Sequence, residues 1–182
     1  MLVRRLTIKN FRGVLAGEIL FTGRTVLVGG NSAGKSTICE ALDLLLGPER
    51  LNRPSPIDEH DFHGRRYLDD DNNPIPIQLE CVLTDLSEDL QRSYRSQSEY
   101  WDTESLNVLD EESSPEDVDK PAVIPAIRIA FEGIYNPAED EFRAQCYFPH
   151  PPPENPETRN RVSRSDKRGF GFIYLRALRT GA

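Results

Sequence analysis

The stretch Gly29–Thr37 constrains this chain more than any other, because it reads Gly-Gly-Asn-Ser-Ala-Gly-Lys-Ser-Thr. It fits the pattern G-x-x-x-x-G-K-[ST] at Gly29, Gly34, Lys35 and Ser36. The apolar run at 25–28 indicates a strand that enters it, and apolar residues at helical spacing indicate a helix that leaves it. The sequence therefore predicts a phosphate-binding loop between a strand and a helix.

The residue types in this loop suit a triphosphate bound with Mg²⁺. Gly29, Gly30 and Gly34 permit the backbone to wrap closely around phosphate oxygens, and Lys35 adds a positive charge. A helix that begins near Lys35 directs its N-terminal N–H groups toward the same phosphates. The Ser36 hydroxyl is placed to bind Mg²⁺. The alternative, a glycine turn before an ordinary helix, is disfavoured by the order of strand, loop and helix.

Composition limits the remaining classes of protein. The 182 residues are 37% hydrophobic and 29% charged, which is enough for one globular domain with a core. The net charge of −8 argues against a surface that wraps nucleic acid as a whole. The isolated Cys39, Cys81 and Cys146 are typical of buried thiols in a reducing compartment. Because no apolar run is long enough to span a membrane, we expect a cytoplasmic protein without membrane partners.

Alternating patterns predict several strands. They are expected at 5–9, 17–21, 24–28, 75–83, 126–131, 141–148 and 170–175, with the segment at 24–28 apolar enough to be central. The helix after the loop should end before Gly47 and Pro48. Asp85 and Glu88 predict the capping box of a short helix. The turn residues between 131 and 141 predict a hairpin.

The remaining segments are expected to be loops. Residues 48–74 form a long polar connection, 99–121 an acidic loop, and 149–156 a proline-rich spacer. The first contains a possible metal-binding set, but its spacing favours a solvated loop with Phe62 anchored in the core; the set is Asp58, Glu59, His60, Asp61 and His63.

A second motif carries a family resemblance. Ile8-Lys9-Asn10-Phe11-Arg12, followed by the phosphate-binding loop, resembles the start of the ABC-type ATPases of the RecF, SMC and Rad50 group. Within that group the chain is most similar to the OLD (overcoming lysogenization defect) family, whose members join an N-terminal ATPase to a C-terminal TOPRIM nuclease. Further similar segments are Asp61-Phe62, Leu83-Thr84-Asp85-Leu86 and the closing 172–179.

The resemblance implies ATP and Mg²⁺ as ligands, with Arg12 beside the phosphates. It implies a homodimer or larger homo-oligomer of the full-length protein, in which two ATPase heads close on nucleotide and DNA binds the complete assembly. Ser32 stands where many of these ATPases have glycine, and a small residue there still permits the turn. The expected nucleotide-binding set is Arg12, Gly29, Gly30, Asn31, Ser32, Ala33, Gly34, Lys35, Ser36 and Thr37, with Ser36 as the Mg²⁺ ligand.

Other elements of a complete ATPase of this type are missing from the sequence. Leu106–Glu111 imitates the strand that carries the Mg²⁺-binding Asp-Glu pair, but Asn107 interrupts its apolar run and its surroundings are acidic. The sequence also lacks an ABC signature, a switch histidine in context and a TOPRIM carboxylate set. We therefore expect residues 1–182 to form an α/β P-loop NTPase fold, the incomplete N-terminal lobe of an ABC-type ATPase head. We expect a mixed sheet with an antiparallel β-subdomain. We also expect the chain to bind ATP without efficient hydrolysis.

Two other functions fit parts of the sequence. A small P-loop phosphotransferase would need an acceptor-binding Asp and lid arginines, for which Asp58–Arg66 is a weak candidate. A non-catalytic DNA-binding or assembly module of an SMC-like complex would use the basic cluster after the proline-rich spacer. That cluster also suits a solvated loop that balances the acidic stretch; its members are Arg159, Arg161, Arg164, Lys167 and Arg168.

Overall fold

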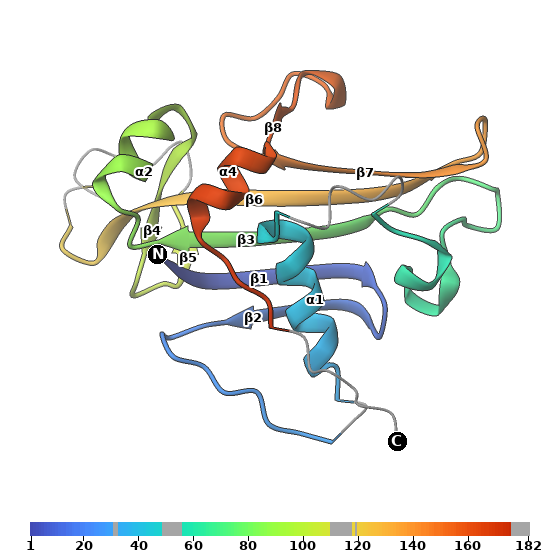
Figure 1. Ribbon diagram of the computed structural model, residues 1–182, viewed down its shortest axis with the longest axis horizontal. Coiled ribbons are helices and arrows are strands. Elements are labelled where there is room, and N and C mark those ends of the chain that lie inside the picture. Colours follow the sequence, from blue (N-terminus) through green and yellow to red (C-terminus); the bar gives the residue numbers. More distant parts are fainter. Residues whose placement is uncertain (31–32, 49–55, 110–117, 119, 176–182) are drawn as a thin grey trace.

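The computed structural model describes residues 1–30, 33–48, 56–109, 118 and 120–175. In this part of the chain an eight-stranded sheet forms the body of the molecule, and α1 (Lys35–Leu46) lies across one of its faces (Figure 1). The strand order is β2-β1-β3-β6-β4-β5, with β7 beside β6 and β8 beside β7. The strands are β1 (Leu2–Phe11), β2 (Val14–Leu20), β3 (Ile77–Thr84), β4 (Ser98–Asp102), β5 (Asn107–Val108), β6 (Val123–Asn136), β7 (Glu141–Phe148) and β8 (Asn160–Arg161).

All pairs of neighbouring strands among these residues are antiparallel. The mixed sheet expected from the sequence is therefore corrected for the described part of the chain. The long strand β6 organises the sheet, since one edge pairs with β3 and the other edge is shared by β4 and β7. The predicted hairpin is confirmed as β6–β7, with Asn136 opposite Glu141.

Alternation along the strands explains why one face is a core. Leu6 and Ile8 of β1 are buried, as predicted, while Lys9 is exposed. In β3 the predicted inward residues are all buried; they are Ile77, Leu79, Cys81 and Leu83. These faces pack against Leu44, Leu45 and Leu46 of α1 in one cluster. The core thus lies between the sheet and the helix that follows the phosphate-binding loop.

The opposite face of the sheet is polar and carries alternating charges. Arg128 of β6 forms ion pairs with Glu80 of β3 at 3.5 Å and with Glu99 of β4 at 2.7 Å. Arg5 of β1 lies 3.7 Å from Glu80 and over the ring of Trp101. These cross-strand pairs join neighbouring strands, and they lie beside a small buried cluster around Trp101 on the same face.

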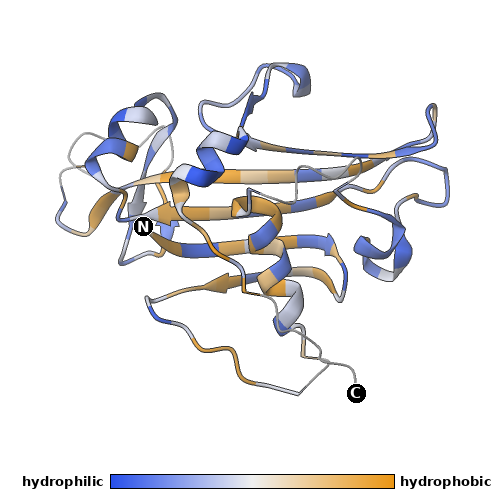
Figure 2. Cartoon of the chain, in the orientation of Figure 1, coloured by the Kyte–Doolittle hydropathy of each residue, from blue (hydrophilic) through white to orange (hydrophobic). Residues whose placement is uncertain are grey.

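The segment at 24–28 differs from its prediction, because no strand is found there. Val26 and Val28 are 84% and 89% exposed, and the apolar segment runs outside the sheet (Figure 2). A strand needs a neighbour to pair its N–H and C=O groups. None of the described strands pairs with these residues, so an apolar composition alone does not make them a strand.

The end of the described chain also differs from its prediction. Residues 170–175 were expected to form a strand, but Phe170 ends helix α4 (Arg164–Phe170), and 172–175 is extended without pairing. Ser163 caps α4 in a capping box with Asp166, a signal that the basic composition obscures. The lysine and arginines expected in a loop are therefore partly helical.

The remaining elements are short. Helix α2 (Glu88–Ser93) is found where expected, but its cap is Ser87, which accepts a hydrogen bond from the Leu90 N–H, so the predicted Asp85 cap is wrong. The proline-rich spacer leads into η5 (Pro156–Thr158). The acidic loop expected at 99–121 is partly strand, because β4 and β5 pair with each other there and β5 contains Asn107; Asp110 and Glu111 lie outside the described residues. No helix of the described chain is long and apolar enough to cross a membrane. The 3-10 helices are η2 (Glu59–Asp61), η3 (His63–Arg65), η4 (Arg95–Gln97) and η5 (Pro156–Thr158).

Candidate nucleotide-binding site

The phosphate-binding loop ends where α1 begins, at Lys35. Gly34 precedes it with φ of +80°, a left-handed conformation that glycine adopts without steric cost. The N–H of Ile38 bonds to the Gly34 carbonyl oxygen at 3.1 Å and closes the first helical turn. Ala33 is exposed and its N–H bonds to Gly30. Asn31 and Ser32 lie outside the described residues.

Lys35 extends its side chain back over the loop. Its Nζ lies 2.6 Å from the carbonyl oxygens of both Gly29 and Gly30. The ammonium group thus joins the start of the loop to the start of the helix. The first turn of α1 holds no acidic residue, so its partial positive charge is not opposed there. Ser36 is exposed, whereas Thr37 is buried. The arrangement offers an ammonium group, a hydroxyl and a helix N-terminus to an anion.

Arg12 approaches the same helix from the β1–β2 hairpin. It lies in the turn between Phe11 and Val14, which face each other in the register, and its φ is +49°. Its guanidinium contacts two carboxylates, Glu40 of α1 and Asp61 of η2, the latter at 2.8 Å from Nε. The hairpin also passes near the first turn of α1, since a Cβ built on Gly13 would lie 4.0 Å from the Thr37 hydroxyl oxygen.

The other residues of the Ile8–Arg12 motif fix this hairpin. Phe11 is fully buried and forms a β-bridge with Phe62. The amide Nδ2 of Asn10 donates to the carbonyl oxygens of Arg66 and Ile75, both at 3.2 Å. The motif therefore joins the hairpin to the segment between α1 and β3. The structure thus gives Asn10 and Phe11 a role in support of Arg12.

The acidic and histidine-rich segment at 58–63 is directed toward Arg12. Asp61 also accepts from the Asp58 N–H in a capping box, and its backbone oxygen accepts from the Arg12 N–H at 2.8 Å. His63 Nδ1 donates to the Arg12 carbonyl oxygen, also at 2.8 Å. Phe62 is anchored in the core, as predicted, with 1% of its surface exposed. Within the described residues, no three His, Cys, Asp or Glu side chains gather as a metal site.

Sequence reasoning missed three partners of Arg12. Glu40 and His63 had no assigned contact to it, and Asp61 was noted only as part of a motif and of a weak metal set. A signal for Glu40 exists, because it lies four residues after Ser36 and therefore on the same face of α1. No local pattern links Asp61 to Arg12, since 49 residues separate them.

Two of the thiols are core residues. Cys81 and Cys146 are buried, and burial raises the pKa of each thiol above its ordinary value. Both groups stay protonated at neutral pH, which makes them poor nucleophiles. They therefore contribute to packing rather than to a reaction.

The basic cluster is only partly available to a ligand. Arg159 forms a bidentate ion pair with Glu132, with distances of 2.6 and 3.1 Å, and stacks over Tyr147. Lys167 is fully buried. Arg161, Arg164 and Arg168 are exposed on or near α4. The structure therefore does not gather the five cations on one surface.

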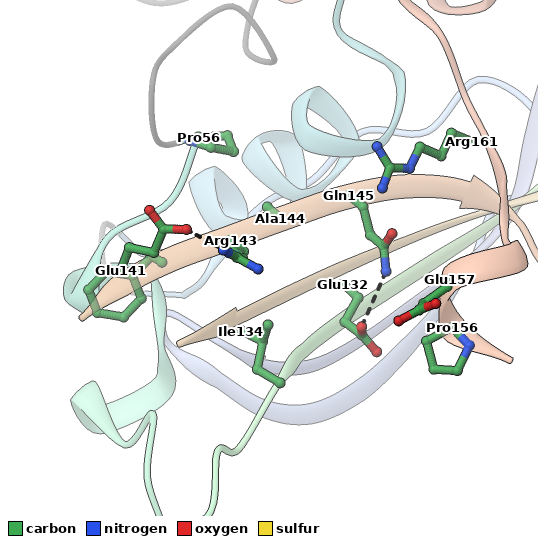
Figure 3. A pocket seen from close by; sticks show the side chains of 11 residues that line it. Pro56, Glu132, Ile134, Glu141, Arg143, Ala144, Gln145, Pro156, Glu157 and Arg161 are labelled. Atoms are coloured by element: carbon green, nitrogen blue, oxygen red, sulfur yellow. Dashed lines mark hydrogen bonds and ion pairs between the residues drawn. The ribbon is translucent and has the colours of Figure 1, made fainter. Parts of the chain in front are cut away.

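A groove of about 470 Å³ lies along β7, away from the predicted nucleotide-binding residues (Figure 3). Several of its polar side chains form ion pairs or hydrogen bonds with one another. Arg143 forms an ion pair with Glu141 at 2.6 Å, and Gln145 donates to Glu132 at 3.5 Å. None of the residues assigned to phosphate binding lines this groove.

A family model and several solved structures are similar to this chain. Residues 1–166 match the family model described as AAA ATPase domain. None of the curated proteins matches the chain significantly. One solved structure, from work on the structural biochemistry of ATP-driven dimerization and DNA-stimulated activation of SMC ATPases, is similar at a TM-score of 0.43 and 16% identity. That alignment covers 91% of this chain and 74% of the other. The family model covers most of the chain, and the chain therefore belongs to the AAA ATPase domain family, whose members have the P-loop NTPase fold and bind nucleotide.

Proposed function

We propose that this chain binds ATP together with Mg²⁺ through Gly29–Thr37. The observation that supports this most directly is Lys35, whose ammonium group lies over the loop at the N-terminal end of α1. Phosphate oxygens can replace the two carbonyl oxygens that Lys35 now contacts, while the helix N-terminus and the loop N–H groups bind the same anion. Ser36 would hold the Mg²⁺ ion, which would supply positive charge against the phosphates.

We further propose that the chain is the N-terminal part of an OLD-type ATP-dependent DNA endonuclease. This finer assignment rests on the Ile8–Arg12 motif before the loop and on the later segments that resemble that family. In such an assembly, two ATPase heads would close on nucleotide, and DNA would be bound by the complete homo-oligomer. Because these 182 residues lack a convincing Asp-Glu strand and signature, we expect them to bind ATP without efficient hydrolysis.

Titration with a fluorescent ATP analogue, with and without Mg²⁺, tests the core of the proposal. The affinity should fall at least tenfold in Lys35→Ala, which corresponds to about 1.4 kcal/mol. Lys120→Ala is the matched control, because Lys120 is an exposed lysine before β6, outside the predicted nucleotide-binding residues, and its loss removes the same charge. Equal affinities of the wild type and Lys35→Ala would contradict ATP binding at this loop.

Hydrolysis and phosphate transfer separate the alternatives. Release of phosphate should stay at background for the wild type, and turnover lost in Lys35→Ala would instead show a complete ATPase. Transfer of phosphate to a nucleoside would favour the phosphotransferase hypothesis. DNA binding at low salt that is lost on replacement of the exposed Arg161 and Arg164 would favour a DNA-binding module.

A further inference from the structure

Arg12 is the second cation near the phosphate-binding helix, and its position depends on distant residues. Its guanidinium lies between a carboxylate of α1 and a carboxylate of η2. An arginine side chain in a hairpin turn has several rotatable bonds, so its place is set by what it contacts.

Asp61 is the better fixed of the two carboxylates. Its side chain is only 7% exposed, compared with 22% for Glu40. Oδ1 accepts from Nε of Arg12, and Oδ2 accepts from the Asp58 N–H at 3.2 Å. With both oxygens engaged, the carboxylate has little freedom to rotate.

The backbone of the same residue also binds the hairpin. The Arg12 N–H donates to the Asp61 carbonyl oxygen, and His63 donates to the Arg12 carbonyl oxygen. Arg12 is thus held through its main chain and its side chain by one segment. These contacts support the left-handed backbone at Arg12, which a non-glycine residue rarely adopts.

Glu40 places the guanidinium relative to the Mg²⁺ ligand proposed above. Glu40 and Ser36 are four residues apart and lie one above the other on α1. Because side chains on a helix lean toward its N-terminus, the Glu40 carboxylate leans toward Ser36. The guanidinium that contacts Glu40 therefore lies over the face of α1 that also carries Ser36.

We propose that Asp61, with Glu40, is a positioning residue of the nucleotide site, which holds the Arg12 guanidinium where it can meet the phosphates. The inference rests on the proposed ATP binding. Asp61 does not touch the nucleotide but acts through Arg12. If the guanidinium is not held in advance, ATP binding must order it, at a cost that corresponds to about two- to tenfold in affinity.

A double-mutant cycle measures this dependence. ATP affinity is compared for the wild type, Arg12→Ala, Asp61→Asn and the double variant, all with Mg²⁺. We expect each single variant to bind about two- to tenfold more weakly, and Asp61→Asn to add nothing once Arg12 is absent. Glu59→Gln is the matched control, because it removes an exposed charge from the same turn without contact to Arg12 and should leave affinity unchanged.

Thermal unfolding of the four proteins separates positioning from folding, since a purely structural role would lower the melting temperature but not the affinity. If Asp61→Asn does not fold, Glu40→Gln in the same cycle tests the other carboxylate. Unchanged or tighter ATP binding by Asp61→Asn, or a loss that persists in full without Arg12, would overturn the inference. Lys35→Ala distinguishes the two proposals. If it abolishes ATP binding while Arg12→Ala, Asp61→Asn and the double variant bind ATP as tightly as the wild type, only this inference fails.

Discussion

Lys167 of α4 donates a hydrogen bond from Nζ to the carbonyl oxygen of Leu44, 2.5 Å away, and so joins α4 to the C-terminal end of α1. The Cys146 thiol of β7 donates to the same oxygen at 3.3 Å. A cation at a helix C-terminus satisfies a carbonyl without an intrahelical partner and stabilises the helix dipole. Helix α1, whose N-terminus is proposed to bind phosphate, is thus anchored at its other end.

We expect Lys167→Ala to lower the free energy of unfolding by about 2–4 kcal/mol, because it removes this hydrogen bond and leaves a cavity in place of a buried side chain. Urea denaturation measures the change. The neighbouring Arg168→Ala is the control, since Arg168 is exposed and its loss should cost less than about 0.5 kcal/mol. Similar decreases in the free energy of unfolding for Lys167→Ala and Arg168→Ala would show that the contact of Lys167 with Leu44 contributes little to stability.

Stability should decrease at alkaline pH because of the buried thiols. Burial, followed by the charge of Glu80, raises the pKa of Cys81 in the folded protein, and burial raises that of Cys146. In the unfolded chain both thiols lose their protons from about pH 8.5 upward. The stability is therefore fully present below that pH and is lost as pH rises, by up to about 1.4 kcal/mol per pH unit for each thiol.

Urea titrations between pH 7 and 10 would show this slope. Cys81→Ala should make it shallower even though it also lowers stability at pH 7, because the substituted residue cannot ionise. An unchanged slope in this variant would mean that other groups cause the alkaline loss. The pKa of Tyr94 is also raised, by burial and by its hydrogen bond to Asp166, so Tyr94 contributes a further decrease in stability above about pH 10.

Thiol labelling should follow burial. Cys39 of α1 is partly exposed, whereas Cys81 and Cys146 are exposed by 0% and 3%. Under native conditions a thiol reagent should therefore modify Cys39 first and the other two only when the protein opens. Mass spectrometry after timed labelling identifies the modified positions. Early modification of Cys146 would contradict the packing of β7 against α1.

The parts of the fold that the sequence predicted correctly are those with local signals. Leu6 and Ile8 alternate with polar residues, so β1 could be recognised without knowledge of its partners. The bounds of α1 followed from the loop before it and from Gly47 after it. Gly47 has a φ of −74°, so the helix ends there without the left-handed glycine cap that many helices have.

The parts that failed depend on distant residues. Whether 24–28 pairs as a strand is decided by its neighbours, which its own apolar composition does not reveal. Helix α4 is short and rich in arginine, so no apolar periodicity marked it, although Ser163 and Asp166 form its cap. In the site, the loop motif was local and recognisable, whereas the contact of Asp61 with Arg12 exists only in the folded chain.

Gly47 is required for close approach at the end of α1. A Cβ there would lie 2.5 Å from the Asp43 carbonyl oxygen and would also meet the Asp43 carboxylate. Because the Gly47 N–H bonds to that same carbonyl oxygen at 2.9 Å, Gly47→Ala must shift the last turn of the helix. We expect the free energy of unfolding, measured by urea denaturation, to fall by about 1–3 kcal/mol.

Gly17→Ala in β2 is the matched substitution, since its Cβ would lie 3.5 Å from Val14 Cγ1, an ordinary contact, and stability should change by less than about 1 kcal/mol. ATP affinity adds a second measurement, because Gly47 lies at the end of α1 opposite to Lys35. Affinity should therefore stay within about twofold of the wild type in Gly47→Ala wherever the protein remains folded. A large loss of affinity without loss of stability would show that the two ends of α1 are coupled, contrary to a helix anchored rigidly by Lys167.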